Sequence, residues 1–190
     1  MKQATVTTLA LLFLCAFLTT KAQETSKAKN TKMKEDKMKD DMGMQQVDLP
    51  YTVSYSSQFK MGKPAQAKMV LDLYQAYDAS DFSKTDWFAD TLTAIFSDGH
   101  LVRGRDAVLD MFKQGRASVS SNKFEITAVM PTHSVDRNED WVSVWGRQLF
   151  TTASDNMQAS HEFNNIWRFN KDGKVDFIEL FEGKTPTQQQ

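Results

Sequence analysis

Hydrophobic positions recur at helical spacing in the first half of the folded part of this chain and at every second position in the second half. After Pro64, a single apolar face predicts a helix that ends near Asp78, because proline at the first helical position costs no hydrogen bond. The inward positions of this helix are Met69, Val70, Leu73, Tyr74 and Tyr77.

Two further helices and one strand are expected before residue 120. The aromatic residues within 81–90 indicate a second, short helix. The run 91–97 is typical of a strand that ends at the Asp98-Gly99 turn signal. A third helix is predicted to begin at Gly104 and to end near Gly115.

The rest of the chain predicts long strands. Alternating residues Phe124, Ile126, Ala128 and Met130 indicate one strand before Pro131. Three more runs, 141–152, 161–169 and 175–181, carry β-branched and aromatic residues, and Asp172-Gly173 separates the last two. This order predicts an α+β fold in which a curved, mostly antiparallel sheet wraps around three N-terminal helices.

The N-terminus differs in character. Residues 1–22 combine a positive start, an apolar middle and a Thr20-Lys21-Ala22 end, which is typical of a secretory signal peptide. We therefore expect export, to a periplasm or out of the cell, with no stable membrane span after cleavage. The alternative is that this segment is retained as an N-terminal anchor. Residues 23–48 form a charged, Lys- and Met-rich linker that we expect to be disordered. An N-terminal arm (49–66), the main domain (67–184) and a tail (185–190) follow.

Several stretches resemble the nuclear transport factor 2-like superfamily, in particular its SnoaL-like and ketosteroid isomerase-like branch. They are Trp87-Phe88-Ala89-Asp90, Gly104-Arg105-Asp106-Ala107-Val108, and the run from Ile166 to Val175 that contains Asn170-Lys171-Asp172-Gly173. The resemblance covers residues 68–183. It implies a cone with a pocket at one end and, in many members, a homodimer.

The run 161–169 is the richest in candidate chemistry. Alternation places His161, Phe163, Asn165 and Trp167 on one face, which we predict to be the concave one. A buried polar group without a partner costs about 1–3 kcal/mol, so His161 and Asn165 require partners. Those partners are other side chains in a closed internal pair, water or a bound molecule.

The resemblance gives further roles. In ketosteroid isomerases a helix tyrosine and a protonated acid form an oxyanion hole, and a second carboxylate moves the proton. Tyr74 matches the tyrosine and Asn165 matches the acid, but the general-base position falls on Phe96, which cannot accept a proton. His161 is a possible base in its place. The candidate catalytic residues are therefore Tyr74, His161 and Asn165, and whether the protein is an enzyme stays open.

We predict that a small, mostly apolar molecule binds in the cone. The expected lining is Tyr74, Phe96, Trp145, His161, Phe163, Asn165 and Trp167, with Phe177 as a further aromatic candidate. The alternatives are a cofactor-free isomerase, cyclase or dehydratase, and a non-catalytic domain that dimerises through the outer sheet face, with Trp141 and Phe150 exposed there.

Composition narrows the remaining possibilities. Lys and Arg number 23 against 24 Asp and Glu, so no basic excess indicates nucleic-acid binding. The one cysteine lies within the predicted signal peptide, and the three histidines have no zinc-site spacing. Two acidic runs, from Asp136 and from Asn170, only partly match a calcium loop. We therefore expect no metal and no cofactor.

Overall fold

The computed structural model describes residues 49–183. The predicted signal peptide (1–22), the linker (23–48) and the tail (185–190) lie outside these residues. The elements are β1 (Phe59–Met61), α2 (Pro64–Asp78), the 3₁₀ turn η1 (Thr85–Trp87), β2 (Phe88–Ile95), β3 (Leu101–Arg103), α3 (Arg105–Ala117), β4 (Val119–Ser134), β5 (Glu139–Thr152), β6 (Gln158–Phe169) and β7 (Val175–Gly183).

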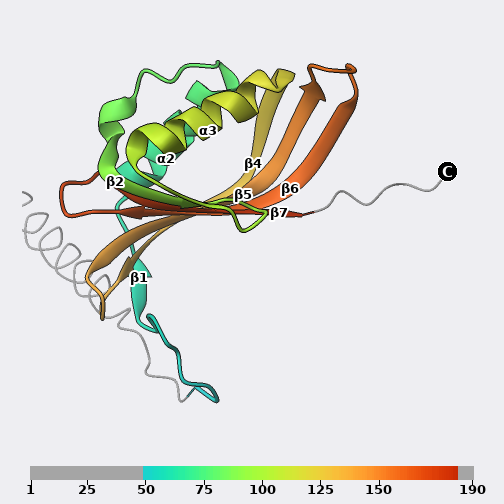
Figure 1. Ribbon diagram of the computed structural model, residues 1–190. Coiled ribbons are helices and arrows are strands. Elements are labelled where there is room, and N and C mark those ends of the chain that lie inside the picture. The colour runs from blue at the N-terminus through green and yellow to red at the C-terminus, as the bar shows by residue number, and fades with distance from the viewer. Residues whose placement is uncertain (1–48, 184–190) are drawn as a thin grey trace, which may run out of the picture. The chain divides into compact units, whose positions relative to one another are not determined.

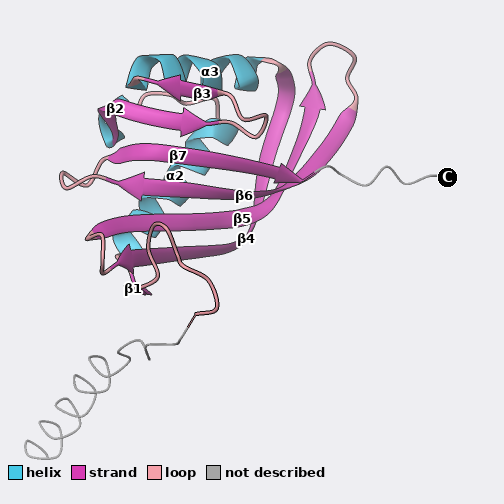
Figure 2. Ribbon diagram, turned by 60° about the horizontal axis from the view of Figure 1, so that its bottom comes forward, coloured by secondary structure: helices cyan, strands magenta, loops and turns pink. Residues whose placement is uncertain are grey.

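Seven strands form one sheet in the order β1-β4-β5-β6-β7-β2-β3. All neighbouring pairs are antiparallel except β2 and β7, which are parallel. The long strands curve, and α2 and α3 lie together against the concave face (Figures 1 and 2). The predicted α+β fold with a curved, mostly antiparallel sheet is thus confirmed.

The prediction of three helices is wrong, because the described residues contain two α-helices. Between residues 81 and 90 the chain forms the turn η1 and then the start of β2. The Asp81 carboxylate accepts a hydrogen bond from the Ser83 backbone N–H at 2.9 Å. This local bond competes with helix formation, so the aromatic residues of this stretch are positioned by a loop and a strand instead.

The bend of the sheet has a local cause in β4 and β5. The register between these strands shifts between Ile126 and Ala128, so β4 contains a bulge at Thr127. Opposite the bulge lies Gly146, where a Cβ would overlap the Glu125 carbonyl oxygen. Bulges bend strands, and a glycine permits the close backbone approach. The alternation of residues 124–130 is therefore divided between the two faces of the sheet.

The core lies between the concave face and the two helices. Fully buried side chains come from every layer: Val70, Leu92, Val108, Val142, Val144, Val175 and Ile178. The helix α3 begins after Gly104, whose φ of +93° only glycine adopts readily. Among residues 49–183 no helix is long and apolar enough to cross a membrane.

Candidate ligand cavity

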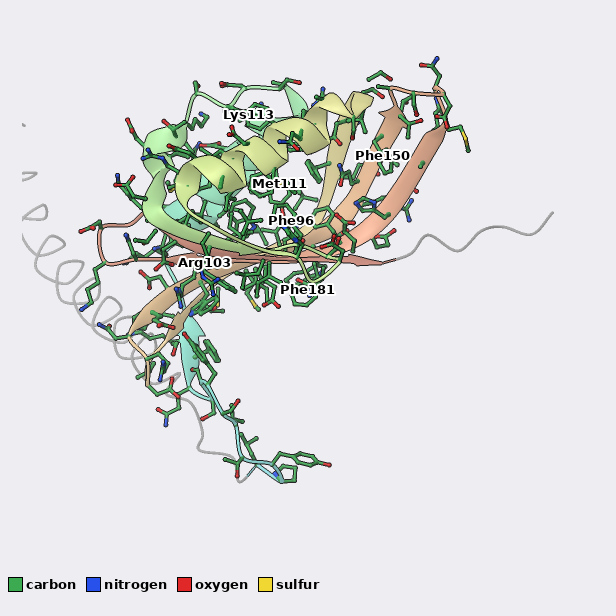
Figure 3. The ribbon with its side chains drawn as sticks, viewed as in Figure 1. Phe96, Arg103, Met111, Lys113, Phe150 and Phe181 are labelled. Atoms are coloured by element: carbon green, nitrogen blue, oxygen red, sulfur yellow. The ribbon has the colours of Figure 1, made fainter. Side chains whose placement is uncertain are left out.

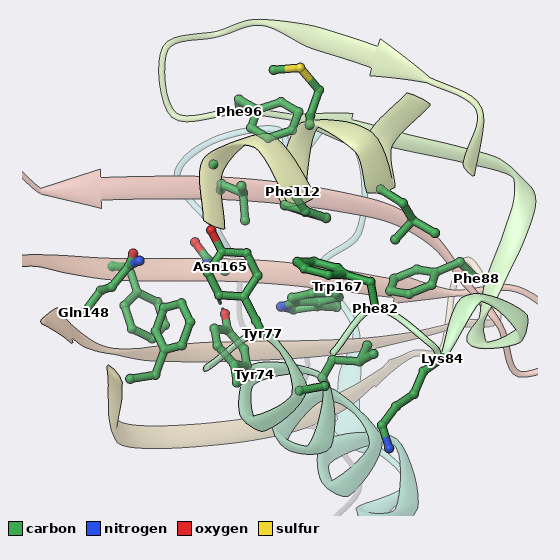
Figure 4. Close-up of a pocket in the computed structure, with 18 of the residues that line it drawn as sticks. Tyr74, Tyr77, Phe82, Lys84, Phe88, Phe96, Phe112, Gln148, Asn165 and Trp167 are labelled. Carbon is green, nitrogen blue, oxygen red and sulfur yellow. Dashed lines mark hydrogen bonds between the residues drawn. The ribbon is translucent and has the colours of Figure 1, made fainter. Parts of the chain in front are cut away.

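A cavity of about 230 Å³ lies between the helices and the concave face of the sheet. Residues from α2, α3, the 81–88 segment and the sheet line it, and most of them are apolar (Figure 4). Its aromatic residues are Tyr74, Tyr77, Phe82, Phe88, Phe96, Phe112, Phe124, Phe163 and Trp167. This volume exceeds the roughly 150 Å³ that holds benzene and approaches the lower limit of about 300 Å³ for drug-sized pockets.

The alternation in β6 puts the predicted residues on the concave face. Phe163, Asn165, Trp167 and Phe169 are buried, while Glu162 and its even-numbered neighbours are more exposed. The inward residues of β6 therefore face the helices across the core. Of these four, Phe163, Asn165 and Trp167 line the cavity.

Asn165 and Tyr74 form a closed internal pair. The Phe181 backbone N–H donates to Asn165 Oδ1 at 3.2 Å, which fixes the orientation of the amide. Asn165 Nδ2 must then be the donor to the Tyr74 hydroxyl, at 2.8 Å. Both side chains are buried. Because Tyr74 accepts this bond, its own O–H proton is free to donate elsewhere.

Trp167 supplies a second donor beside Tyr74. Its buried Nε1–H lies close enough to the Tyr74 hydroxyl to act as a hydrogen-bond donor to it. The indole nitrogen points toward the Tyr74 hydroxyl in Figure 4, and the two rings lie 5.8 Å apart. Burial raises the pKa of Tyr74, and its contacts with Asn165 and Trp167 offset this only in part. Tyr74 thus stays protonated and acts as a donor, not as a base.

Phe96 also lines the cavity, in contact with Phe112 at a centroid distance of 5.7 Å. Trp145 does not. It is the register partner of Asn164 on the outer face, while the neighbouring Val144 pairs with the buried Asn165. Trp145 lines an open groove on that outer face instead. The inward positions of β5 are the even-numbered ones, which its aromatic composition alone did not reveal.

Phe177 and Phe150 also lie on faces opposite to those predicted. Phe177 contacts Trp141 on the outer side of the sheet, at a centroid distance of 6.1 Å. Phe150 contacts His161, at 5.5 Å, on the concave side. Trp141 is on the outer face as expected, but it is only partly exposed because Tyr55 of the arm also packs against it.

His161 lies beside the cavity but not in its lining. A hydrogen-bonded chain connects it to the end of α2. Asn122 Nδ2 donates to the Asp78 carboxylate at 2.7 Å, and Gln148 Nε2 donates to Asn122 Oδ1 at 2.5 Å. Gln148 Oε1 is then left to accept from His161 Nε2, at 2.7 Å. The chain therefore fixes the proton of a neutral His161 on Nε2.

The sequence reasoning missed Glu182, a carboxylate that lines the cavity. Its Oε2 accepts a hydrogen bond from Ser97 Oγ at 3.0 Å, and its Oε1 lies 3.7 Å from His161 Nε2. The signal was present: Ile178, Leu180 and Glu182 share one face of β7 by alternation. The predicted strand ended one residue too early, at 181, to include it. Within residues 49–183 no cluster of His, Cys, Asp or Glu could hold a metal ion.

Comparison with known proteins gives a consistent picture. The SnoaL-like domain family matches residues 70–177 of the chain. No curated protein matches the sequence.

Solved structures share the fold at low sequence identity. An NTF2-like protein from Exiguobacterium sp. 255-15 is 20% identical, with a TM-score of 0.51 over 60% of this chain and 98% of that one. A putative SnoaL-like polyketide cyclase from Shewanella denitrificans OS-217 is 8% identical, with a TM-score of 0.54 over 64% and 92%. SalBIII, an epoxide hydrolase/cyclase-like enzyme of pyran ring formation in salinomycin, is 15% identical, with a TM-score of 0.52 over 63% and 92%.

Proposed function

The chain belongs to the SnoaL-like family of the nuclear transport factor 2-like superfamily, and on this basis we propose that it binds a small, mostly apolar molecule in the cavity below its helices. One observation carries the proposal: at an apolar cavity, the buried Tyr74 hydroxyl accepts a hydrogen bond from Asn165, and its own O–H proton has no acceptor among the described residues.

The free O–H donor of Tyr74 indicates which chemical groups the ligand carries. An unmatched buried donor costs about 1–3 kcal/mol, and a guest that carries an acceptor oxygen removes this cost. The cavity volume of about 230 Å³ suits one or two rings and is too small to enclose a large polycyclic molecule. The proposed ligand is therefore a neutral, ring-sized molecule with a carbonyl or ether oxygen.

Binding of two isosteric probes tests this proposal. Acetophenone has a carbonyl oxygen where α-methylstyrene has a methylene group, so the pair isolates the hydrogen bond. We expect acetophenone to bind about fivefold more tightly by calorimetry, as one hydrogen bond of about 1 kcal/mol allows. Tyr74→Phe should remove that preference, and Tyr51→Phe, at an 84% exposed tyrosine, should keep it. Failure of both probes to bind would refute the proposal.

An enzymatic function is the second candidate, and Glu182 is the observation in its favour. The general-base position of the resemblance falls on Phe96, which has no carboxylate. Glu182 of β7 supplies a carboxylate at the same cavity as the Tyr74 donor. A carboxylate can take a proton from a carbon next to a carbonyl and return one from solvent. The test is deuterium exchange at the acetophenone methyl group in heavy water. We expect exchange above the buffer rate, and its loss in Glu182→Gln.

Export and self-association complete the proposal. Export rests on the signal-like residues 1–22, and homodimer formation on the outer sheet face. Met130 and Phe181 are 40% and 45% exposed on that face, beside the half-buried Trp145. Figure 3 places Phe181 on the side of the sheet away from the helices. These residues, in place of the expected Trp141 and Phe150, form the apolar surface for a second copy.

A further inference from the structure

Tyr74 and Glu182 are two polar points of the cavity. A guest with a single acceptor oxygen would bind to Tyr74 and leave the Glu182 carboxylate without a partner. The Glu182 side chain is 42% exposed at the end of β7, and it lines the cavity together with Gln148. The Ser97 hydroxyl occupies one lone pair of Oε2. A carboxylate can accept about four hydrogen bonds, so most of its accepting capacity stays available.

The hydrogen-bonded chain from Asp78 directs the Nε2 proton of His161 away from Glu182, so His161 does not occupy the accepting positions of that carboxylate. The imidazole Nε2–H donates to Gln148 Oε1 at 2.7 Å, while Glu182 Oε1 lies farther away, at 3.7 Å. The Nε2 proton of His161 is therefore directed to Gln148, and the Glu182 carboxylate at the cavity is left without a close hydrogen bond from His161. The cation that lines the cavity, Lys84, has its Nζ 4.6 Å above the Trp87 ring.

The two polar points are separated along the sheet. Asn165, which holds the Tyr74 hydroxyl, pairs with Leu180, whereas Phe163 pairs with Glu182. Two residues along a strand correspond to about 7 Å. Rings fill the wall between these points, with Tyr74 stacked on Phe163 at 5.5 Å. This spacing of the strand positions is comparable to the span of a para-substituted benzene ring.

We propose that Glu182 forms a second subsite that accepts a hydrogen bond from a hydroxyl or ammonium group of the guest. The ligand class is then a small ring-containing molecule with an acceptor oxygen at one end and a donor at the other. This proposal rests on the proposed function, since it needs the cavity to bind a guest. It adds a selectivity that the Tyr74 donor cannot produce.

Three acetophenones of similar size test the subsite on the purified full chain. They carry a hydroxymethyl, an aminomethyl or an ethyl group at the para position. Burial of a polar group without a hydrogen-bond partner costs free energy because the group loses its hydration. Without the subsite, the ethyl compound must therefore bind best. With it, at least one of the two donor compounds should bind roughly tenfold more tightly than the ethyl compound, as a hydrogen bond to a charged acceptor allows.

Two variants assign the preference to the carboxylate. In Glu182→Leu the order should reverse, with the ethyl compound the tightest. Glu179→Leu removes the same charge from the opposite face of β7, where residue 179 pairs with Ile166 of the outer groove, and should keep the wild-type order.

The outcomes distinguish failure of the Glu182 subsite from failure of the proposed ligand binding on which it rests. Acetophenone binding together with a preference for the ethyl compound overturns the subsite and leaves the proposed function standing. A donor preference that survives in Glu182→Leu also overturns the subsite. If none of the compounds binds, both proposals fail.

Discussion

At the scale of single residues, the pair formed by Tyr74 and Asn165 should contribute to folding as well as to binding. Tyr74→Phe removes the acceptor of a buried amide N–H, so we expect unfolding to become easier by about 1–3 kcal/mol. Urea unfolding measures this change. The control is Tyr51→Phe, which should change stability by less than about 0.5 kcal/mol because its ring is exposed. Equal stability of Tyr74→Phe and wild type would show that the pair is not formed.

Alternation predicted the buried face of β6 correctly, because that face carries the aromatic rings that drive its burial. It did not predict the partners of the polar groups, since those come from other elements. Asn165 meets α2, and Gln148, not a ligand, meets His161. Trp145 was assigned to the wrong face because aromatic residues occur on both sides of β5. Side-chain type indicates burial, but only register decides which layer buries a residue.

At the scale of elements, Asp140 connects the start of α2 to the hairpin between β4 and β5. Its carboxylate accepts hydrogen bonds from Lys63 at 2.6 Å, from His133 at 2.7 Å and from Gln66 at 3.0 Å. Burial alone would raise the pKa of Asp140, but these bonds outweigh it and lower the pKa to about 2. The folded state therefore favours the ionised carboxylate.

This shift predicts acid sensitivity with a definite sign. A lowered pKa in the folded state stabilises the protein above the ordinary value of 3.8, and the stabilisation is lost as the pH falls toward about 2. Asp140→Asn should cost about 1 kcal/mol at neutral pH, since solvent screens the exposed Lys63, and the difference from wild type should shrink in acid. Asp110→Asn, from an exposed pair with Lys113, is the control. A difference that does not vary with pH would contradict this assignment.

The bulge in β4 yields a prediction about Gly146. Any Cβ at this position overlaps the Glu125 carbonyl, so Gly146→Ala should destabilise the domain by about 1–3 kcal/mol, as overpacking does. Gly183→Ala is the matched control, because its Cβ would meet the nearest atom at 3.6 Å. Thermal unfolding compares the two. Equal melting temperatures would mean that the strands can separate there at no cost.

At the scale of the whole domain, most of the fold could be predicted because its signals are local. Pro64 begins α2, glycines mark the turns, and two different periodicities separate helices from strands. What could not be predicted depends on contacts between distant segments. The short helix expected over 81–90 was overridden by the Asp81 turn, and the β4 bulge depends on a glycine in another strand. The cavity itself is a consequence of that curvature, which no single segment encodes.

The outer face of the sheet gives the last prediction, which concerns assembly. Exposed apolar patches on folded domains commonly mark interaction surfaces, and a two-fold dimer places the same patch on both partners. We therefore expect light scattering to show a dimer. The double variant Met130→Lys with Phe181→Lys should weaken it about a hundredfold while acetophenone binding persists, since these residues lie across the sheet from the cavity. Met157→Lys, at a 63% exposed residue away from the groove, should leave the dimer intact. A wild-type monomer at high concentration would mean that this surface has another role.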